Sequence, residues 1–214
     1  MPRAPDARGR GLLRGAGGAD LTGRAQLAAA LHATLLEPEA ATRIDVPGAK
    51  QSAVLVPLYL DAVGALHAVF TERRPDLRRH PGEISFPGGR RDDEDPHLCA
   101  TALREAHEEI GLPPDAVELV GALQPTPTFV TNYAIYPFVG LIEPGFAWVI
   151  AEAEVGRVLE LPVEALRTGH ARRRLVRRGM PFRTDTYEVG DALVWGATAR
   201  IVADLLERVP AAAA

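Results

Sequence analysis

The chain has 214 residues, of which 47% are hydrophobic and 24% charged, and its formal net charge is -4. This length and composition are typical of one globular domain with a proper core, and the slight negative charge disfavours general binding to nucleic acid or membranes. The single cysteine, Cys99, excludes an internal disulfide and a cysteine metal cluster. The sequence lacks both the apolar core of a secretory signal and an apolar run long enough to span a membrane, so we expect a cytoplasmic protein.

The first residues predict a tail followed by a helix. Residues 1–20 are rich in Gly, Arg and Ala without periodicity, which favours a flexible N-terminal tail ahead of a domain over 21–210. The domain opens with a predicted helix that is capped near Thr22 and ends before Pro38.

Apolar runs bounded by turn residues predict the strands of the domain. These runs are 52–60, 65–73, 116–124 and 134–142. The first two flank a turn at Gly64 and should pair as a hairpin, and a second hairpin is predicted over 172–189 with its turn at Gly179. A short helix that begins at Pro162 and a longer one over 193–209 complete the chain. Strands mixed with helices in this way indicate a layered α/β or α+β domain.

One further helix has plain start and stop signals. Asp95 followed by Pro96 predicts an N-cap and a first turn, and Gly111 predicts the end of the helix. Apolar residues recur between them at spacings of four, three and four and predict an inward-facing stripe. This stripe consists of Cys99, Leu103, Ala106 and Ile110. The cysteine is therefore expected to be a buried, inert thiol.

Three glutamates, Glu105, Glu108 and Glu109, lie on another face of this helix. Like charges at this spacing cost stability unless a cation lies among them, and Arg104 is placed to hold Glu108 by an ion pair. A solvated acidic face is the plain alternative. The preceding sequence SFPGG (85–89) favours a ligand site instead, because its glycines allow a tight turn and bring bare carbonyls close to a ligand. Clustered carboxylates with a carbonyl suit Mg²⁺ or Mn²⁺, and Mg²⁺ usually works with phosphate substrates.

The segment 88–112 resembles the Nudix box, the signature of hydrolases that cleave nucleoside diphosphates linked to another moiety. Its part REAHEEIGL matches the pattern R-E-apolar-x-E-E-x-G-apolar at every position. The general box has an acid six residues after its glycine and an arginine eight residues further on. Here Asp95 is six residues after Gly89 but Arg104 lies nine beyond it, so the loop is one residue longer and the role of Asp95 is left open.

The resemblance implies a Nudix-type α/β/α sandwich with a mixed β-sheet and a set of functional residues. Glu105 and Glu109 should be the main ligands of a Mg²⁺ or Mn²⁺ ion, with Glu108 and the carbonyl of Gly88 as further ligands. Catalytic roles fall to Glu105 or Glu108, which would orient or deprotonate the attacking water, and to Arg104. A carboxylate of a later loop is the alternative base, and the candidates there are Glu152 and Glu154.

Residues 70–89 resemble the motif that precedes the box in coenzyme A pyrophosphatases, L-L-T-x-R-x-x-x-L-R-x-x-x-G-x-x-x-F-P-G-G. The matching positions are Thr71, Arg73, Leu77, Arg78, Gly82, Phe86, Pro87, Gly88 and Gly89, and Phe70 replaces a leucine. The longer box loop and the sequence TALRE also resemble that subfamily. The resemblance implies hydrolysis of coenzyme A or a derivative to 3′,5′-ADP and 4′-phosphopantetheine or its acyl form. The substrate would be bound by Arg73, Arg78, Arg79, His80 and Gly89.

Two other functions remain open. Pro127 lies fifteen residues after Leu112, near a proline position common in ADP-ribose hydrolases, which keeps ADP-ribose or another nucleoside diphosphate derivative as an alternative substrate. A non-catalytic Nudix domain that senses a nucleotide is the alternative from another class, although such domains commonly lose box glutamates. We expect a small-molecule partner, not nucleic acid or a membrane, and the oligomeric state is left open with a homodimer among the options.

Overall fold

A computed structural model describes residues 17–77, 82–128, 131–177 and 179–210. The helices are α1 (Gly17–Thr34), α2 (Pro38–Thr42), α3 (Leu98–Ile110), α4 (Val163–Thr168) and α5 (Gly196–Arg208), with one 3-10 helix, η1 (Pro114–Ala116). The strands are β1 (Lys50–Leu60), β2 (Leu66–Arg73), β3 (Ile84–Ser85), β4 (Gly88–Arg90), β5 (Glu118–Ala122), β6 (Thr126–Pro127), β7 (Tyr133–Leu141), β8 (Val155–Pro162), β9 (His170–Arg177), β10 (Met180–Val189) and β11 (Ala192–Trp195).

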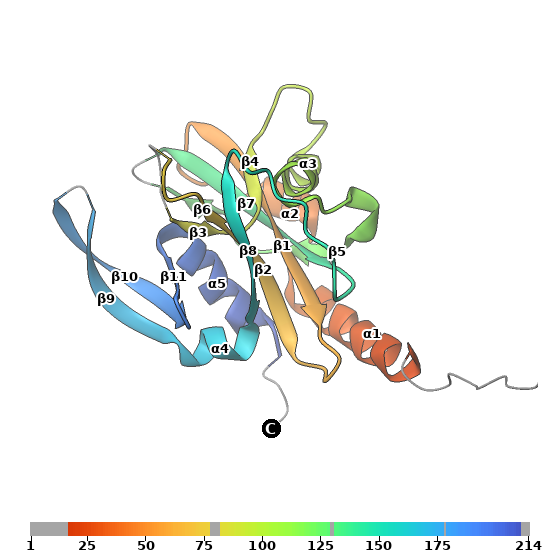
Figure 1. The fold of residues 1–214 in the computed structure, drawn as a ribbon. Helices are drawn as coiled ribbons and strands as arrows, with labels where there is room; N and C mark the ends of the chain where they lie inside the picture. Colours follow the sequence, from red (N-terminus) through yellow and green to blue (C-terminus); the bar gives the residue numbers. More distant parts are fainter. Residues whose placement is uncertain (1–16, 78–81, 129–130, 178, 211–214) are drawn as a thin grey trace, which may run out of the picture.

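The strands form two sheets (Figure 1). The larger sheet has the order β3-β2-β1-β7-β5, with β4 paired to β1, β6 to β7 and β8 to β2. It is a mixed sheet, because β1 runs parallel to β7 and antiparallel to β2. The smaller sheet is antiparallel and has the order β11-β10-β9.

The continuous apolar run of β1 is buried on both faces of the larger sheet. Alternate residues of a strand point to opposite faces, and Val54 and Val56 lie in a core formed with α1, α4 and α5. Ala53 and Leu55 lie in a second core on the opposite face, formed with α2 and α3. The chain is therefore an α/β/α sandwich around a mixed sheet, as the sequence predicts (Figure 1).

Most of the predicted elements are confirmed. The runs at 52–60, 65–73, 116–124 and 134–142 coincide with β1, β2, β5 and β7, and β1 and β2 form the expected antiparallel hairpin. Gly64 and Gly179 have φ angles of 81° and 75°, which glycine adopts freely in turns. The hairpin of β9 and β10 and the short helix α4 are also found where they are predicted.

Two predicted helix starts are wrong, and one long strand is missed. The first helix begins at Gly17, not near Thr22, so residues 17–20 of the expected tail are helical. Thr22 therefore lies inside α1, and a residue inside a helix cannot be its N-cap. Residues 193–195, predicted as helix, belong to strand β11, and the last helix begins only at Gly196, whose φ of 69° interrupts the extended backbone. Strand β8, which pairs along β2, has no counterpart among the predictions.

Within the described ranges, no helix is both long and apolar enough to cross a membrane.

Candidate active site

Helix α3 begins two residues later than the sequence predicts. Its N-cap is His97, whose Nδ1 accepts a hydrogen bond from the backbone N–H of Ala100 at 3.0 Å. The prediction that Asp95 is the N-cap is wrong, because the Asp95 carboxylate binds Arg104 and Thr101 instead. The predicted end is confirmed, since Gly111 has a φ of 72° and its N–H donates to the carbonyl of His107.

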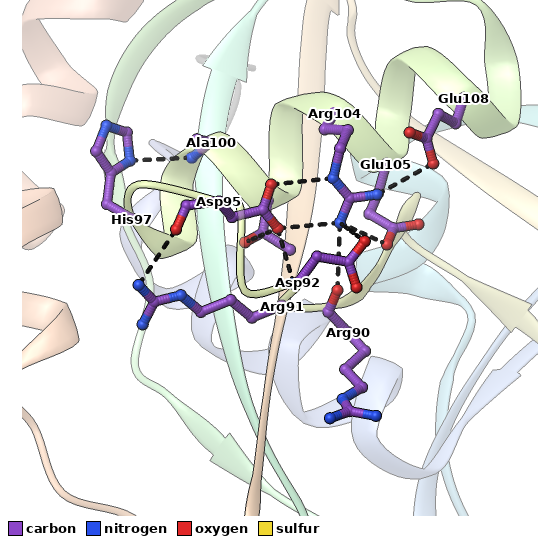
Figure 2. Close-up of polar contacts among 10 residues, drawn as sticks. Arg90, Arg91, Asp92, Asp95, His97, Ala100, Arg104, Glu105 and Glu108 are labelled. Atoms are coloured by element: carbon purple, nitrogen blue, oxygen red, sulfur yellow. Dashed lines mark hydrogen bonds and ion pairs between the residues drawn. The ribbon is translucent and has the colours of Figure 1, made fainter.

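Asp95 is a buried anchor for Arg104 (Figure 2). The guanidinium donates from Nε to Asp95 Oδ1 and from Nη2 to Oδ2, both at 3.0 Å. Thr101 Oγ1 and the backbone N–H of Asp92 also donate to this carboxylate, at 2.9 and 3.0 Å. The hydrogen-bonded guanidinium holds the pKa of Asp95 well below its usual range. Asp95, whose role the longer box loop leaves open, therefore fixes the loop before α3 by binding Arg104.

Arg104 is also the cation among the acidic residues of α3. Its Nη1 lies 3.1 Å from Glu108 Oε2, which confirms the predicted ion pair, and its Nη2 lies 3.0 Å from Glu105 Oε1. The same Nη2 donates to the carbonyl of Arg90 at 3.3 Å (Figure 2). These pairs relieve part of the repulsion that the sequence predicts between the glutamates. Arg104 acts on its neighbours by holding them in place.

The glycines ahead of the helix lie in a strand and do not form the expected tight turn. Gly88 and Gly89 belong to β4, which pairs antiparallel with β1. A Cβ on Gly88 would lie 2.6 Å from the Cα of Val54, and the φ of 156° also favours glycine there. A Cβ on Gly89 would overlap the carboxylate of Glu105, and its carbonyl accepts a hydrogen bond from Ser52 Oγ at 2.6 Å. The two glycines therefore let β4 approach β1 on one side and α3 on the other.

Glu105 and Glu109, four residues apart on α3, lie over this glycine strand. Glu109 Oε2 accepts a hydrogen bond from the N–H of Gly88 at 3.1 Å. Burial raises the pKa of Glu109 to about 7, and the nearby carboxylates of Glu105 and Glu154 add to the rise, while the Gly88 N–H and Arg73 oppose it. Burial also raises the pKa of Glu105, against the effect of Arg104. Both carboxylates thus lie where their negative charge is incompletely compensated, an environment that a divalent cation would stabilise.

The three glutamates do not converge as expected. Among the residues that the structure describes, no three His, Cys, Asp or Glu side chains form a group that could hold a metal ion. Glu108 is turned toward Arg104 and its side chain is 57% exposed, whereas that of Glu105 is 18% exposed. The donors that fit Mg²⁺ or Mn²⁺ are therefore the oxygen atoms of Glu105 and Glu109 beside the Gly88 peptide, and Glu108 stands apart from them.

A segment before β8 is tied to the C-terminal end of α3. The N–H of Ala151 donates to the carbonyl of Glu109 at 2.9 Å, and the N–H of Val149 donates to that of Ile110 at 3.1 Å. This attachment places Glu154 beside Arg73, with 3.5 Å between Oε2 and Nη1. Glu154 is one of the two later carboxylates that the sequence names as an alternative base, and Arg73 is one of the predicted substrate ligands.

Other predicted residues are placed as follows. Arg78, Arg79 and His80 lie outside the described residues. Burial raises the pKa of Cys99 to about 11, which agrees with an inert thiol. Pro127 lies in β6, where its carbonyl accepts a hydrogen bond from Arg200.

Ser52 and Ala151, which support the glycine strand and the end of α3, are not among the predicted site residues. Each contacts a residue more than thirty positions away in the sequence, and no local pattern predicts such contacts. Asp92 and His97 are missed as well, because histidine is not one of the residues usually found at an N-cap and the contact of Asp92 with Arg104 spans twelve residues.

Comparison with known proteins places these features in a family. The family model of the NUDIX domain matches residues 49–178. An uncharacterized Nudix hydrolase NudL from Enterobacter sp. (strain 638) is 40% identical over 163 residues, which cover 75% of this chain and 83% of the relative. The protein of the same description from Klebsiella pneumoniae (strain 342) is 40% identical over 164 residues, or 76% of this chain and 84% of the relative.

Solved structures give more distant matches. A crystal structure of DR0079 from Deinococcus radiodurans has a TM-score of 0.47 at 15% identity and covers 72% of this chain and 81% of its own. A C. elegans Ap4A hydrolase has a TM-score of 0.45 at 13% identity and covers 54% of this chain and 81% of its own.

Proposed function

Because the chain belongs to the Nudix hydrolase family, we propose that it splits the diphosphate of coenzyme A or an acyl derivative into 3′,5′-ADP and a 4′-phosphopantetheine compound. The observation that carries the hydrolytic part is the pair of carboxylates, Glu105 and Glu109, held in a partly buried position over Gly88 and Gly89. Cleavage of a diphosphate needs a divalent cation to offset the negative charge of the substrate, and carboxylate oxygens are the ligands that such a cation prefers.

Each side chain has a role in this proposal. Glu105 and Glu109 would hold a Mg²⁺ or Mn²⁺ ion, which would supply the positive charge that offsets the diphosphate and activates water. Glu108, the exposed carboxylate paired with Arg104, accepts the proton of the attacking water. Arg104 restrains Glu105 and Glu108, and Asp95 in turn restrains Arg104, so the carboxylates are oriented before substrate arrives.

The choice of coenzyme A rests on the motif over 70–89. Within its described part, Arg73 extends from the end of β2 toward Glu154, and Arg74 is held by Asp76 and by the carbonyl of Glu152. Arg73 lies close enough to Glu109 to lower its pKa, so a guanidinium borders the carboxylate pair. Guanidinium groups suit phosphate oxygens, and coenzyme A carries both a diphosphate and a ribose phosphate.

The test is a cleavage assay with the purified protein. Coenzyme A is incubated with Mg²⁺ or Mn²⁺, and the products are separated by chromatography, with chelator and the Glu109→Gln variant as controls. We expect 3′,5′-ADP and 4′-phosphopantetheine in equal amounts, and neither product in the two controls. Coenzyme A that stays intact with both metals rejects the substrate assignment.

ADP-ribose remains the second candidate substrate, because Pro127 stands near a proline position common in ADP-ribose hydrolases. Pro127 lies in β6, between β5 and β7 in the chain. A panel of coenzyme A, acyl derivatives, ADP-ribose and other nucleotide sugars, run in competition, ranks them by kcat/KM. A nucleotide sensor is the remaining alternative. The sensor hypothesis would replace the enzyme hypothesis if no compound of the panel were cleaved and one of them bound with equal affinity to the wild type and to Glu109→Gln.

A further inference from the structure

A hollow of about 420 Å³ opens beside the glycine strand. It lies between the start of β1 and the loop that follows β4, and its volume is within the range of small-molecule sites. Its lining residues are Ala49, Lys50, Gln51, Arg90, Arg91, Asp92 and Asp93. None of them is among the predicted site residues.

Two cations of the hollow are available to bind a ligand. Lys50 lies at the start of β1, with its Nζ 5.6 Å from the centre of the Tyr133 ring, and Tyr133 is its partner in the β1–β7 register. The side chain of Arg90 points away from the Arg104 cluster (Figure 2). Among the residues that the structure describes, neither side chain has a carboxylate partner. A strong anion would therefore gain two charge-assisted contacts without breaking an existing pair.

The other charges of the hollow are mostly engaged. Arg91 donates to Gln51 Oε1 at 3.2 Å and to the carbonyl of Asp95 at 3.3 Å. Asp92 lies 3.7 Å from Nη2 of Arg104. Asp93 is exposed and has no ion pair within the described part of the chain, so its charge opposes an anion there.

The hollow adjoins the carboxylate pair. Nη2 of Arg104 donates to the carbonyl of Arg90 at 3.3 Å and lies 3.0 Å from Glu105 Oε1, so one nitrogen bridges the wall of the hollow and the reaction site. Arg90 also follows Gly89, on which the Glu105 carboxylate lies. A diphosphate bound through a metal ion at Glu105 and Glu109 would thus lie next to the hollow.

We propose that Lys50 and Arg90 bind a phosphomonoester on the ribose of the substrate, apart from the diphosphate that is cleaved. This inference rests on the proposed function for the position of the diphosphate. The ribose of coenzyme A carries such a group at its 3′ oxygen, and dinucleotides phosphorylated at the 2′ oxygen carry the same chemistry. A phosphomonoester has a charge between -1 and -2 at neutral pH and three acceptor oxygens, which suits one ammonium and one guanidinium.

Binding of three nucleotides tests the site without catalysis or metal. The full-length protein is titrated in a calorimeter with 5′-AMP, 3′,5′-ADP and 2′,5′-ADP in the presence of chelator. We expect 3′,5′-ADP to bind about tenfold more tightly than 5′-AMP, since a hydrogen-bonded charge contact is worth roughly that factor. Lys50→Ala and Arg90→Ala should each bring this ratio toward one.

Two more variants sharpen the test. Asp93→Asn removes the opposing charge and should raise the ratio about twofold to threefold. Arg174→Ala removes an exposed arginine of β9 that lines no part of the hollow, and should leave the ratio at the wild-type value.

The outcomes separate this inference from the proposed function. A ratio near one in the wild type, or a preference that survives both cation substitutions, overturns the phosphomonoester site even if coenzyme A is cleaved. Tighter binding of 2′,5′-ADP than of 3′,5′-ADP, lost in the Lys50 and Arg90 variants, upholds the site and moves the substrate from coenzyme A to 2′-phosphorylated dinucleotides.

Discussion

The carboxylate of Glu105 lies directly against the α-carbon of Gly89, in the space that a Cβ would need. Gly89→Ala should therefore displace this carboxylate, which is the flexible end of a side chain, at little cost in stability. We expect the melting temperature to stay within about 2 °C of the wild type while kcat/KM falls about 100-fold, because small misplacements of a catalytic group have effects of that size. Thermal unfolding and the cleavage assay measure the two quantities.

Gly88→Ala is the matched contrast. Its Cβ would meet backbone atoms of β1, including the Cα of Val54 at 2.6 Å, and backbone cannot move aside as a side chain does. We expect a loss of about 3 kcal/mol or more in the free energy of unfolding, or about 10 °C in melting temperature. Equal stability of the two variants would contradict the different surroundings described for the two glycines.

Glu109→Gln should separate metal binding from folding. The wild type at a metal concentration of about 100 times Kd should gain roughly 2.7 kcal/mol in unfolding free energy, which thermal unfolding with and without Mn²⁺ detects. The variant should lose most of this gain. Without metal it should be at least as stable as the wild type, because it keeps the acceptor for the Gly88 N–H and lacks a charge that burial disfavours. A variant with the full Mn²⁺ response excludes Glu109 as a ligand.

Asp95→Asn should cost stability in a pH-dependent way. The pKa of Asp95 is lowered in the folded chain, so its contribution is fully present above the unfolded pKa of about 3.9 and is lost as the pH falls below it. We expect the variant to be about 2 kcal/mol less stable than the wild type at pH 7. Urea denaturation at several pH values should show this gap narrowing below pH 4. A gap of constant size would mean that the Asp95 charge does not stabilise the fold.

Gly111→Ala tests the attachment of the segment before β8. The glycine has a φ of 72°, and a Cβ there would also lie 2.8 Å from the Cβ of Val149. Gly64→Ala is the control, because its φ is 81° and nothing lies within 4 Å of the added carbon. Both should lose about 1 kcal/mol to the left-handed backbone, and Gly111→Ala about 1–2 kcal/mol more. Hydrogen exchange of the Ala151 amide should rise only in the Gly111 variant.

The sequence predicts the fold where a local pattern has one interpretation. The sequence of β1 is apolar at both odd and even positions. Burial on both faces and a central place in the sheet follow directly from this pattern. The end of α3 at Gly111 follows equally well, since a glycine after an apolar stripe is a strong stop signal.

The start of α3 and the state of its glutamates could not be predicted in the same way. Asp95 has the residue type of an N-cap, but Arg104, nine residues later, binds its carboxylate more strongly than a helix terminus would. Arg104 likewise supplies a positive charge that the spacing of the glutamates alone attributes to a metal ion. Side-chain partners chosen among several candidates depend on packing, which a single sequence does not reveal.

The guanidinium at the centre of the acidic cluster has a consequence for biosynthesis. A cation that is part of the polypeptide is present from the moment of translation, so the box helix can dock on the sheet in a cell depleted of divalent ions. Docking of α3 on the sheet is therefore independent of any ion that binds the folded protein later.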